Sequence, residues 1–376
     1  MASALSLALA MFVEALGYGM VAPTLPFLAR QAGAGVERIG FLVGLYAAVG
    51  LVVSIPFGLL AHRFGRRTLI LVGLGCLTAA SLAFIWAPTY PWLVTARFAQ
   101  GLGATAIWVG SLTVVADLSP SGSLGKSLSW ITGAWSLGFV VGPALGGLGS
   151  VRFPFVLYAV LSGVAFLAAL IALPETGRPG VRTTLAGVLR ILKRPAVLAS
   201  AGATFSLSFY YGTIEAFVPL MISARGAGRA WIGLLFTIAG LPAIVLPQIS
   251  GRLADRFGDR RVVIAGLLYG AALNAGSLFL LDRIPLWALF VLIGLVEVLI
   301  YVPAVALLHR DVEKDDRVFA SGSHSYAFSA GFFAGPLLGG ALLPRGGEPM
   351  LFIMLTATMV AGIVIVLVAR DRAPVR

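Results

Sequence analysis

The sequence predicts an all-α membrane protein with twelve transmembrane helices arranged as two six-helix bundles. Three observations carry this prediction. The chain is 59% hydrophobic and only 11% charged, whereas soluble domains are about 25% charged. Apolar runs of about 20 residues recur from end to end, which is the length that crosses a hydrocarbon core of ~30 Å. The third observation is an internal repeat that divides the chain into halves of equal length.

The repeat is a parallel duplication. Gly58–Arg67 (Gly-Leu-Leu-Ala-His-Arg-Phe-Gly-Arg-Arg) returns as Gly251–Arg260 (Gly-Arg-Leu-Ala-Asp-Arg-Phe-Gly-Asp-Arg), an offset of 251 − 58 = 193 residues. Gly138–Gly147 returns as Gly331–Gly340 at the same offset. Six spans in each half of a parallel repeat predict two bundles related by an axis along the membrane normal. Smaller matches at this offset pair Tyr18 with Tyr211, Gly19 with Gly212, Pro26 with Pro219, Gly40 with Gly233 and Gly101 with Gly294.

The apolar runs give the expected elements and domains. We expect an N-terminal bundle at 1–173, a cytoplasmic linker rich in Arg and Pro at 174–195, and a C-terminal bundle at 196–376. The first run lacks a basic start and is too long for a signal peptide, so we interpret it as a retained span. The twelve expected spans are 5–27, 39–61, 68–86, 91–115, 127–149, 152–173, 196–222, 231–251, 262–281, 285–308, 318–341 and 349–369.

The distribution of basic residues predicts the orientation. With the N-terminus placed inside, 19 Lys and Arg fall in inner loops and tails and 7 in outer loops, so both termini are expected in the cytoplasm. The net charge of +12 then reflects these loops and anionic lipid headgroups, and not a nucleic-acid partner. The single cysteine, Cys76, excludes an intramolecular disulfide. The expected location is the plasma membrane of a bacterium or archaeon.

Gly58–Arg67 resembles the signature of the loop between spans two and three in the major facilitator superfamily. That resemblance covers nearly the whole chain and implies a loop that locks one conformation by placing an acidic residue at a helix N-terminus. His62 occupies the acidic position here, whereas the second copy keeps Asp255, so we expect a weaker or pH-sensitive lock in the first copy. The residues expected to form locks in the two copies, together with the Gly-Pro segments described next, are Gly58, His62, Arg63, Gly65, Arg66, Gly251, Asp255, Arg256, Gly138, Gly142, Pro143, Gly335 and Pro336.

Gly138, Gly142 and Gly146 are four residues apart, so they line one helix face where another backbone can approach closely. Pro143 removes a donor from the helix and is expected to bend it. This stretch resembles the antiporter signature of the same family, which implies export in exchange for protons. Because the pattern returns in the span 318–341, helix packing alone is the alternative interpretation.

Charged residues within the apolar spans are candidates for proton coupling. Leu93–Ala104 resembles a fourth-span motif of the family whose buried Arg is linked to proton coupling, and it places Arg97 within the span 91–115. A cation at the bilayer centre costs about 2.5 kcal/mol or more without a partner. Glu14, Glu215 and Glu297 also lie within spans, where removal from water favours the protonated form. We expect Glu14 and Glu297, at mid-depth, to suit coupling best, with Glu215 nearer the outer face; static packing pairs are the alternative.

Two further polar residues have weaker assignments. Asp117 is expected to be a loop or helix-cap residue at the inner end of its span. His324 lies early in the span 318–341, where assistance to proton transfer and a plain packing role are both open. His62, His309 and His324 show no metal-ligand spacing, and the chain has no phosphate-binding loop for ATP, so neither a metal nor a cofactor is expected.

In the fold that the resemblance implies, spans one, four, seven and ten of the chain line a central cavity. Their polar and aromatic residues include several tyrosines, Trp108, Ser206 and Ser208 but only one amide, Gln100, whereas a sugar site needs many amides and carboxylates. Such a cavity suits amphipathic or cationic lipophilic compounds, which bind by dispersion and cation–π contacts. The expected substrate-binding residues are Tyr18, Gln100, Trp108, Tyr210, Tyr211 and Tyr301.

The sequence therefore predicts a transporter and not an enzyme: a proton-coupled exporter of small amphipathic or lipophilic compounds that works by alternating access. Its expected partners are a small-molecule substrate, protons and the lipid bilayer, and it is expected to be a monomer. Two alternatives stay open at this stage. One is a facilitator or symporter for a sugar, amino acid or organic acid, and the other is a membrane sensor or scaffold that transports nothing.

Overall fold

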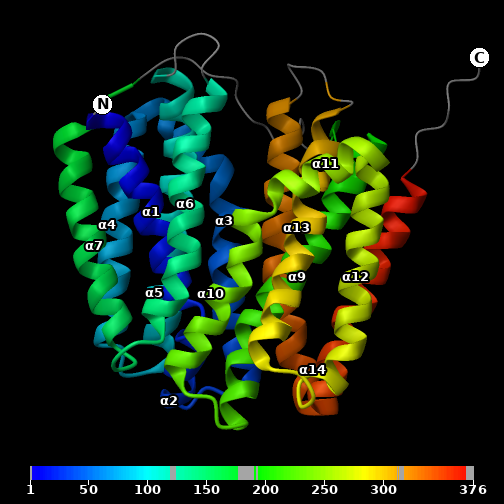
Figure 1. Cartoon of the computed structure of the whole chain (residues 1–376). Helices are drawn as coiled ribbons and strands as arrows, with labels where there is room; N and C mark the ends of the chain where they lie inside the picture. Colours follow the sequence, from blue (N-terminus) through cyan, green and yellow to red (C-terminus); the bar gives the residue numbers. More distant parts are fainter. Residues whose placement is uncertain are drawn as a thin grey trace, which may run out of the picture. The chain divides into compact units, whose positions relative to one another are not determined.

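The structure is a computed structural model that describes residues 2–118, 124–176, 190–191, 194–310, 312 and 317–369. Every regular element in these ranges is an α-helix (Figure 1). The first half contains α1 (Ala2–Val21), α2 (Leu25–Gln31), α3 (Val36–Phe64), α4 (Arg66–Ile85), α5 (Tyr90–Leu118), α6 (Leu124–Gly146) and α7 (Phe153–Ala172). The second half contains α9 (Pro195–Ala224), α10 (Arg229–Val245), α11 (Pro247–Phe257), α12 (Asp259–Leu280), α13 (Leu286–Arg310) and α14 (Arg317–Val368).

These helices account for all twelve expected spans. Nine of the described helices are long and apolar enough to cross a membrane, and the pair α10 and α11, bent by 49°, forms a tenth. α12 corresponds to the expected span 262–281, which begins among charged residues and carries the polar Asn274. α14 is broken at Gly347 (φ 65°, ψ −162°) and so supplies the last two spans. The chain is thus a multi-pass all-α membrane protein.

Contacts between backbones divide the chain into two compact units. Unit 1 consists of Met1–Arg182 and Glu215–Thr237, and unit 2 consists of Thr183–Ile214 and Ile238–Arg376. The end of α9 and the start of α10 therefore pack within unit 1, although they belong to the second half of the sequence. Most of the expected linker 174–195 lies outside the described residues, so the domain boundaries drawn from the sequence stay a prediction.

The glycines four residues apart in α6 form a seam with α1, as their spacing predicts. A Cβ added at Gly138, Gly142 or Gly146 would overlap carbonyl oxygens of α1, which belong to residues 12, 16 and 20. Only residues without side chains allow this approach, and the two helices meet backbone to backbone. The hydroxyl of Thr24 closes the end of the seam by donating to the carbonyls of Met20 and Gly146, each at 3.0 Å.

The same seam occurs in unit 2, at the repeat offset. A Cβ at Gly331 or Gly335 of α14 would overlap the carbonyl oxygens of Phe205 and Phe209 in α9, which match residues 12 and 16 of α1. The duplicated Gly-Pro segments therefore have a packing role in both halves. A further part of these segments in antiport stays a prediction.

The duplicated segments Gly58–Arg67 and Gly251–Arg260 are almost entirely helical, and not loops. α3 runs to Phe64 and α4 begins at Arg66, so only Gly65 separates them, in a left-handed conformation (φ 90°) that favours glycine. Gly258 (φ 88°) does the same between α11 and α12. In contrast, a Cβ at Gly58 or at Gly251 would meet no described atom within 4 Å, so neither glycine lies in a close helix contact in this conformation.

In each half, an arginine at the start of the third span donates to backbone carbonyls near the end of the sixth span. Arg67 donates from Nη2 to the Leu170 carbonyl near the end of α7 (2.5 Å). Its counterpart Arg260 donates to the carbonyls of Val366 (3.2 Å) and Ala369 at the end of α14. The last carbonyls of a helix have no partner within that helix, and a cation there also complements the helix dipole.

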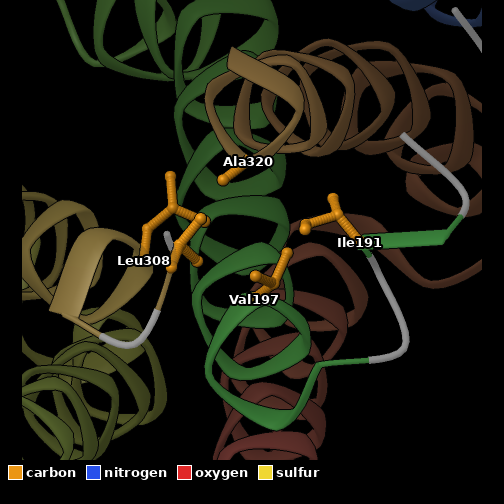
Figure 2. Close-up of a cluster of buried hydrophobic side chains, with 5 residues drawn as sticks. Ile191, Val197, Leu308 and Ala320 are labelled. Carbon is orange, nitrogen blue, oxygen red and sulfur yellow. The ribbon is translucent and has the colours of Figure 1, made fainter. Parts of the chain in front are cut away.

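The ends of three helices of unit 2 are joined by a buried apolar cluster, shown in Figure 2. Val197 of α9, Leu308 of α13 and Ala320 of α14 contribute to it, together with residues that precede or follow these helices. This cluster fills the space between the helices at the end of unit 2 where α9 and α14 begin. Its members are Ile191, Val197, Leu308, Val312 and Ala320.

The backbone seam predicts how α6 responds to added side chains. Gly142→Leu should destabilise the protein by about 1–3 kcal/mol, because the new side chain must displace the Leu16 carbonyl in a packed interface. Gly133→Ala in the same helix is the matched control, since its Cβ would meet open space. Thermal unfolding of the detergent-purified protein measures both effects. Equal transition temperatures for the two variants would contradict the seam.

Candidate functional site

The side chain of Arg97, on α5, is fully buried in unit 1. Its Nη1 donates to Gln100 Oε1 (2.8 Å), and its Nη2 donates to the Val43 carbonyl (3.3 Å). Its guanidinium carbon lies 4.8 Å from the centre of the Tyr46 ring and 5.9 Å from that of Tyr18. No carboxylate of the described residues lies within salt-bridge distance of it. Neutral dipoles and aromatic faces therefore surround this cation in the present conformation.

Glu14, on α1, is buried, and each of its carboxylate oxygens accepts one hydrogen bond. Tyr46 donates its hydroxyl to Oε1 (2.7 Å), and Trp135 of α6 donates its indole N–H to Oε2 (2.9 Å). The Trp135 ring stacks on Phe139 at 5.2 Å and meets Trp108 edge-on at 5.8 Å. The carboxylate thus lies among aromatic rings, with a fixed donor for each oxygen.

Glu215 is the second carboxylate of the cluster. It lies on the part of α9 that belongs to unit 1, it is 4% exposed, and its Oε2 accepts the hydroxyl of Tyr18 at 2.5 Å. The rings of Tyr18 and Tyr46 are 5.0 Å apart. Each tyrosine therefore bonds one carboxylate and also contacts the guanidinium of Arg97, so two acids and one base are linked through two phenols.

Glu297, on α13, lies in unit 2 and accepts the hydroxyl of Tyr211 at Oε2 (2.6 Å). Tyr211 is the repeat counterpart of Tyr18. Equivalent tyrosines therefore donate to a carboxylate in each unit, although Glu215 and Glu297 are not themselves equivalent in the repeat. Depth within the spans favours Glu14 and Glu297 over Glu215 for coupling, whereas the structure links Glu14 to Glu215 through Tyr46, Arg97 and Tyr18.

A hydroxyl is inserted into the backbone of α6 beside its proline. Thr237 of α10 donates to the Val140 carbonyl (2.8 Å) and accepts the N–H of Ala144 (3.1 Å). These two backbone groups would bond each other in an unbroken helix. Pro143, between them in sequence, offers no N–H of its own, so the helix is open here to an external partner.

The contact between α6 and α10 continues to the end of α6 and the start of α10. A Cβ at Gly233 would overlap the Pro143 carbonyl, and one at Gly147 would overlap the Arg229 carbonyl. The guanidinium of Arg229 donates to the carbonyls of Gly149 (3.2 Å), Ser150 (3.2 Å) and Gly146 (3.5 Å). Helix α10 is therefore fastened to α6 by backbone contact, one hydroxyl and one cation.

Comparison with known proteins decides the family. A family model described as "Major Facilitator Superfamily" matches residues 7–231 and 201–376, which together cover nearly the whole chain. The chain belongs to the major facilitator superfamily. It is accordingly a multi-pass membrane transporter of small molecules, and not an enzyme.

Relatives and solved structures agree with this membership. Multidrug resistance protein 1 of Bacillus subtilis (strain 168) is 27% identical to this chain, in an alignment that covers 88% of this chain and 87% of that protein. Quinolone resistance protein NorA of Staphylococcus aureus (strain COL) is 25% identical over 96% and 94%. The crystal structure of a mutant of the nucleoside transporter NupG superposes with a TM-score of 0.81 at 12% identity, covering 98% of this chain and all of that one. A bacterial homologue of the lysosomal transporter Spinster gives 0.74 at 15%, covering 98% and 94%.

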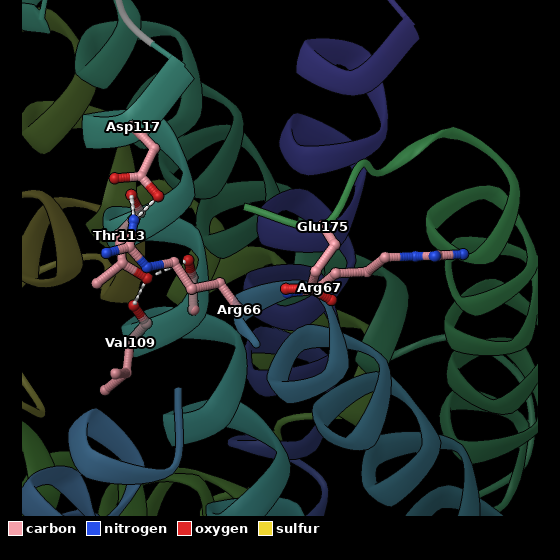
Figure 3. Close-up of polar contacts among 7 residues, drawn as sticks. Arg66, Arg67, Val109, Thr113, Asp117 and Glu175 are labelled. Carbon is pink, nitrogen blue, oxygen red and sulfur yellow. Dashed lines mark hydrogen bonds and ion pairs between the residues drawn. The ribbon is translucent and has the colours of Figure 1, made fainter. Parts of the chain in front are cut away.

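The superfamily signature at the start of α4 forms a polar cluster (Figure 3). Arg66 forms an ion pair with Asp117 near the end of α5 and donates to the Thr113 carbonyl (3.2 Å). Asp117, expected to be a loop or cap residue, therefore lies in α5 and bonds the first residue of α4. The backbone N–H of Arg67 faces Glu175 Oε1 at 3.4 Å.

Glu175 supplies an acidic group at the N-terminus of α4. Its carboxylate lies over Gly65, where an added Cβ would overlap it. An anion at this position is stabilised by the free N–H groups and the dipole of the helix. In the second copy an aspartate within the segment itself, Asp259, occupies the first turn of α12. The side chain of His62 lies outside the described part of the chain, so its effect on the lock stays a prediction.

The remaining expected lock residues lie on the surface of the duplicated segments. Arg63 lies over the ring of Phe64 and Arg256 over that of Phe257, each at 5.2 Å, so the two repeats again agree. These contacts lie within single helices and do not test the proposed lock.

The expected substrate-binding residues separate into two groups. Gln100 and Tyr210 are 1% exposed, and Gln100 holds Arg97, so these two have internal positions. Tyr18 is also largely covered, since it bonds Glu215. Trp108 and Tyr211 are partly exposed, and Tyr301 is 40% exposed. Sequence reasoning missed Tyr46, Trp135 and Thr237, because it searched only the four spans that line the cavity in the family fold.

The contact between α6 and α10 should weaken when the Thr237 hydroxyl is removed. Thr237→Val keeps the shape of the side chain but leaves the Val140 carbonyl and the Ala144 N–H without their bridge, which should weaken the contact by about 1–3 kcal/mol. Spin labels at Phe153 and Trp231, in a Cys76→Ser background, should then report a longer and broader distance distribution.

Thr132→Val is the matched control for this experiment. The Thr132 hydroxyl is exposed and donates only to carbonyls of its own helix, so its loss should leave the distance unchanged. An identical distribution in the wild type and in Thr237→Val would show that the bridge does not hold the contact.

Proposed function

We propose that this transporter is a proton-coupled exporter of amphipathic or lipophilic cations that works by alternating access. The observation that carries the proposal is the cluster in which Glu14 and Glu215 are both linked through tyrosines to the buried Arg97. One ionised carboxylate is enough to balance the positive charge of Arg97, so one of the two acids, Glu14 or Glu215, can stay protonated. Removal of all three from water favours the protonated form of at least one acid, which can then be exchanged.

The sign of coupling follows from charge. With one carboxylate ionised, the cluster is neutral together with Arg97, and the second acid holds its proton. A cationic substrate that binds nearby adds a positive charge, which favours ionisation of the remaining acid and releases that proton. When the cationic substrate leaves, its positive charge is removed, and the second acid binds a proton again. Substrate and proton therefore compete, which is the requirement for antiport.

The chemistry of the cluster also defines the substrate class. Trp108, Trp135 and Phe139 present aromatic surface beside Glu14, and such surface with few amides binds apolar cations by dispersion and cation–π contacts. The names of the two relatives, a multidrug resistance protein and a quinolone resistance protein, agree with substrates of this type.

Orientation and assembly complete the proposal. The excess of Lys and Arg in the inner loops supports cytoplasmic termini in a bacterial or archaeal plasma membrane. The contact between α6 and α10 then lies toward the outside, and it must open before substrate can leave. Glu297, held by Tyr211 in unit 2, provides a further protonatable group. A monomer contains every residue that this mechanism uses.

Proton movement in reconstituted vesicles tests the proposal. Addition of tetraphenylphosphonium to acid-loaded vesicles should make the lumen more alkaline, as reported by a trapped pH dye. Glu215→Gln and Glu297→Gln should each reduce this signal by roughly tenfold or more, since couplings between two ligands commonly amount to 5–150-fold. Glu37→Gln, which changes an exposed carboxylate in the first turn of α3, is the matched control.

The possible results separate the functions. A response to sugars, amino acids or organic acids but not to the cation would keep antiport and overturn the substrate class. Silence toward every compound, combined with counterflow of a metabolite, would replace the proposal with a facilitator. A full signal in Glu215→Gln would remove that residue from the coupling mechanism.

A further inference from the structure

Three layers of side-chain contacts connect α9 to its neighbours in unit 2. Tyr211 bonds Glu297 of α13 (2.6 Å), and Thr204 Oγ1 lies 3.1 Å from Nδ1 of His324 on α14. One turn nearer the start of α9, Ser200 donates to a carbonyl of α13 (2.7 Å). Because α9 and α13 run in opposite directions, these layers follow one another along the unit, with about 1.5 Å of rise per residue.

Tyr301 connects the first two layers. It lies four residues after Glu297 on α13, which places both side chains on one face of that helix. Its ring meets the imidazole of His324 edge-on, with centroids 5.6 Å apart and planes inclined by 66°. Tyr211, Glu297, Tyr301 and His324 thus follow one another along unit 2, with a hydrogen bond between the first two and a ring contact between the last two.

The titratable side chains of this series are partly exposed, whereas the hydroxyl residue that holds His324 is covered. Tyr301 is 40% exposed, Tyr211, Glu297 and His324 have intermediate exposure, and Thr204 is 1% exposed. The apolar cluster of Figure 2 includes Ala320, which precedes His324 by one turn of α14. His324 is therefore the titratable group of this series that lies nearest to the end of unit 2 where α9 and α14 begin.

We propose that His324 is the proton relay between Glu297 and water on the side of unit 2 where α9 and α14 begin. The proposal rests on the proposed function, in which Glu297 exchanges protons. The carboxylic acid of Glu297 gives its proton to the hydroxyl oxygen of Tyr301, while the hydroxyl proton passes to His324. The products are a carboxylate and an imidazolium, and the imidazolium then loses its proton to water.

The surroundings of His324 suit this task. Imidazole gains and loses a proton near neutral pH, and the Thr204 hydroxyl either donates to or accepts from Nδ1, so it holds the ring in both protonation states. The ring of Tyr301 on α13 contacts His324, and Glu297 lies one turn away from Tyr301 on that helix. α9 carries no charged residue between Pro195 and Ile214, and its titratable groups are Tyr210 and Tyr211. The nearest titratable neighbour on α14 is Tyr326.

The test compares proton-driven transport with exchange in the same vesicles. The full-length protein is reconstituted, and tetraphenylphosphonium uptake driven by a pH gradient is divided by its counterflow at equal pH. His324→Asn should lower this ratio by about tenfold or more and flatten its dependence between about pH 6 and 8, because positioned proton transfer contributes large rate factors. Ser325→Ala, next in sequence and bonded to its own helix, is the matched control.

Chemical rescue distinguishes a relay from a packing role. Added imidazole should restore part of the ratio in His324→Ala but not in Glu297→Gln, since only the first variant lacks an imidazole. An unchanged pH profile in His324→Asn would overturn the relay, and so would a loss in His324→Ala that imidazole does not restore. If Glu297→Gln itself keeps full proton-driven uptake, the role of Glu297 in the proposed function fails, and the relay fails with it. If Glu297→Gln loses uptake while His324→Asn does not, only the relay is wrong.

Discussion

The buried guanidinium of Arg97 is the interaction on which the rest of unit 1 depends. An uncompensated charge in an apolar interior is costly, and Arg97 keeps its charge at any physiological pH. The structure meets that charge with the amide oxygen of Gln100, a carbonyl of α3 and two tyrosine rings. Those tyrosines in turn bond Glu14 and Glu215, so the protonation of two acids is tied to one fixed cation.

The glycine seams make this arrangement possible by fixing where the helices lie. Backbone contact of α6 with α1 places Trp135 beside Glu14, and the same contact of α14 with α9 recurs in unit 2. The duplication has kept this frame while the charges have diverged. Arg97 corresponds to the buried Phe290, and Glu14 corresponds to the buried Leu207. Among the residues of the Arg97 cluster, only Tyr18 has an identical counterpart in the second half. That counterpart, Tyr211, also bonds a carboxylate.

The sequence predicted the fold and the seams well because both rest on regular spacing. Apolar run length gives the spans, and glycines at intervals of four define a helix face whatever that face contacts. The site was predicted less completely, because depth in a span does not tell toward which neighbour a side chain points. Glu215 was ranked low on depth, yet its side chain bonds Tyr18. Glu175 belongs to the segment predicted to be a linker, yet it lies at the N-terminus of α4. It faces the N–H of Arg67, which is 108 residues away in sequence.

The most direct test of this account is the proton release that accompanies substrate binding in solution. Tetraphenylphosphonium is added to the detergent-purified protein in a weakly buffered solution that contains a pH dye, and calorimetry measures the amount bound. Coupling through the two acids around Arg97 should release about one proton for each cation bound, and this release should be lost when Glu14 and Glu215 are both changed to Gln. Binding of the cation by the wild-type protein without any proton release would contradict it.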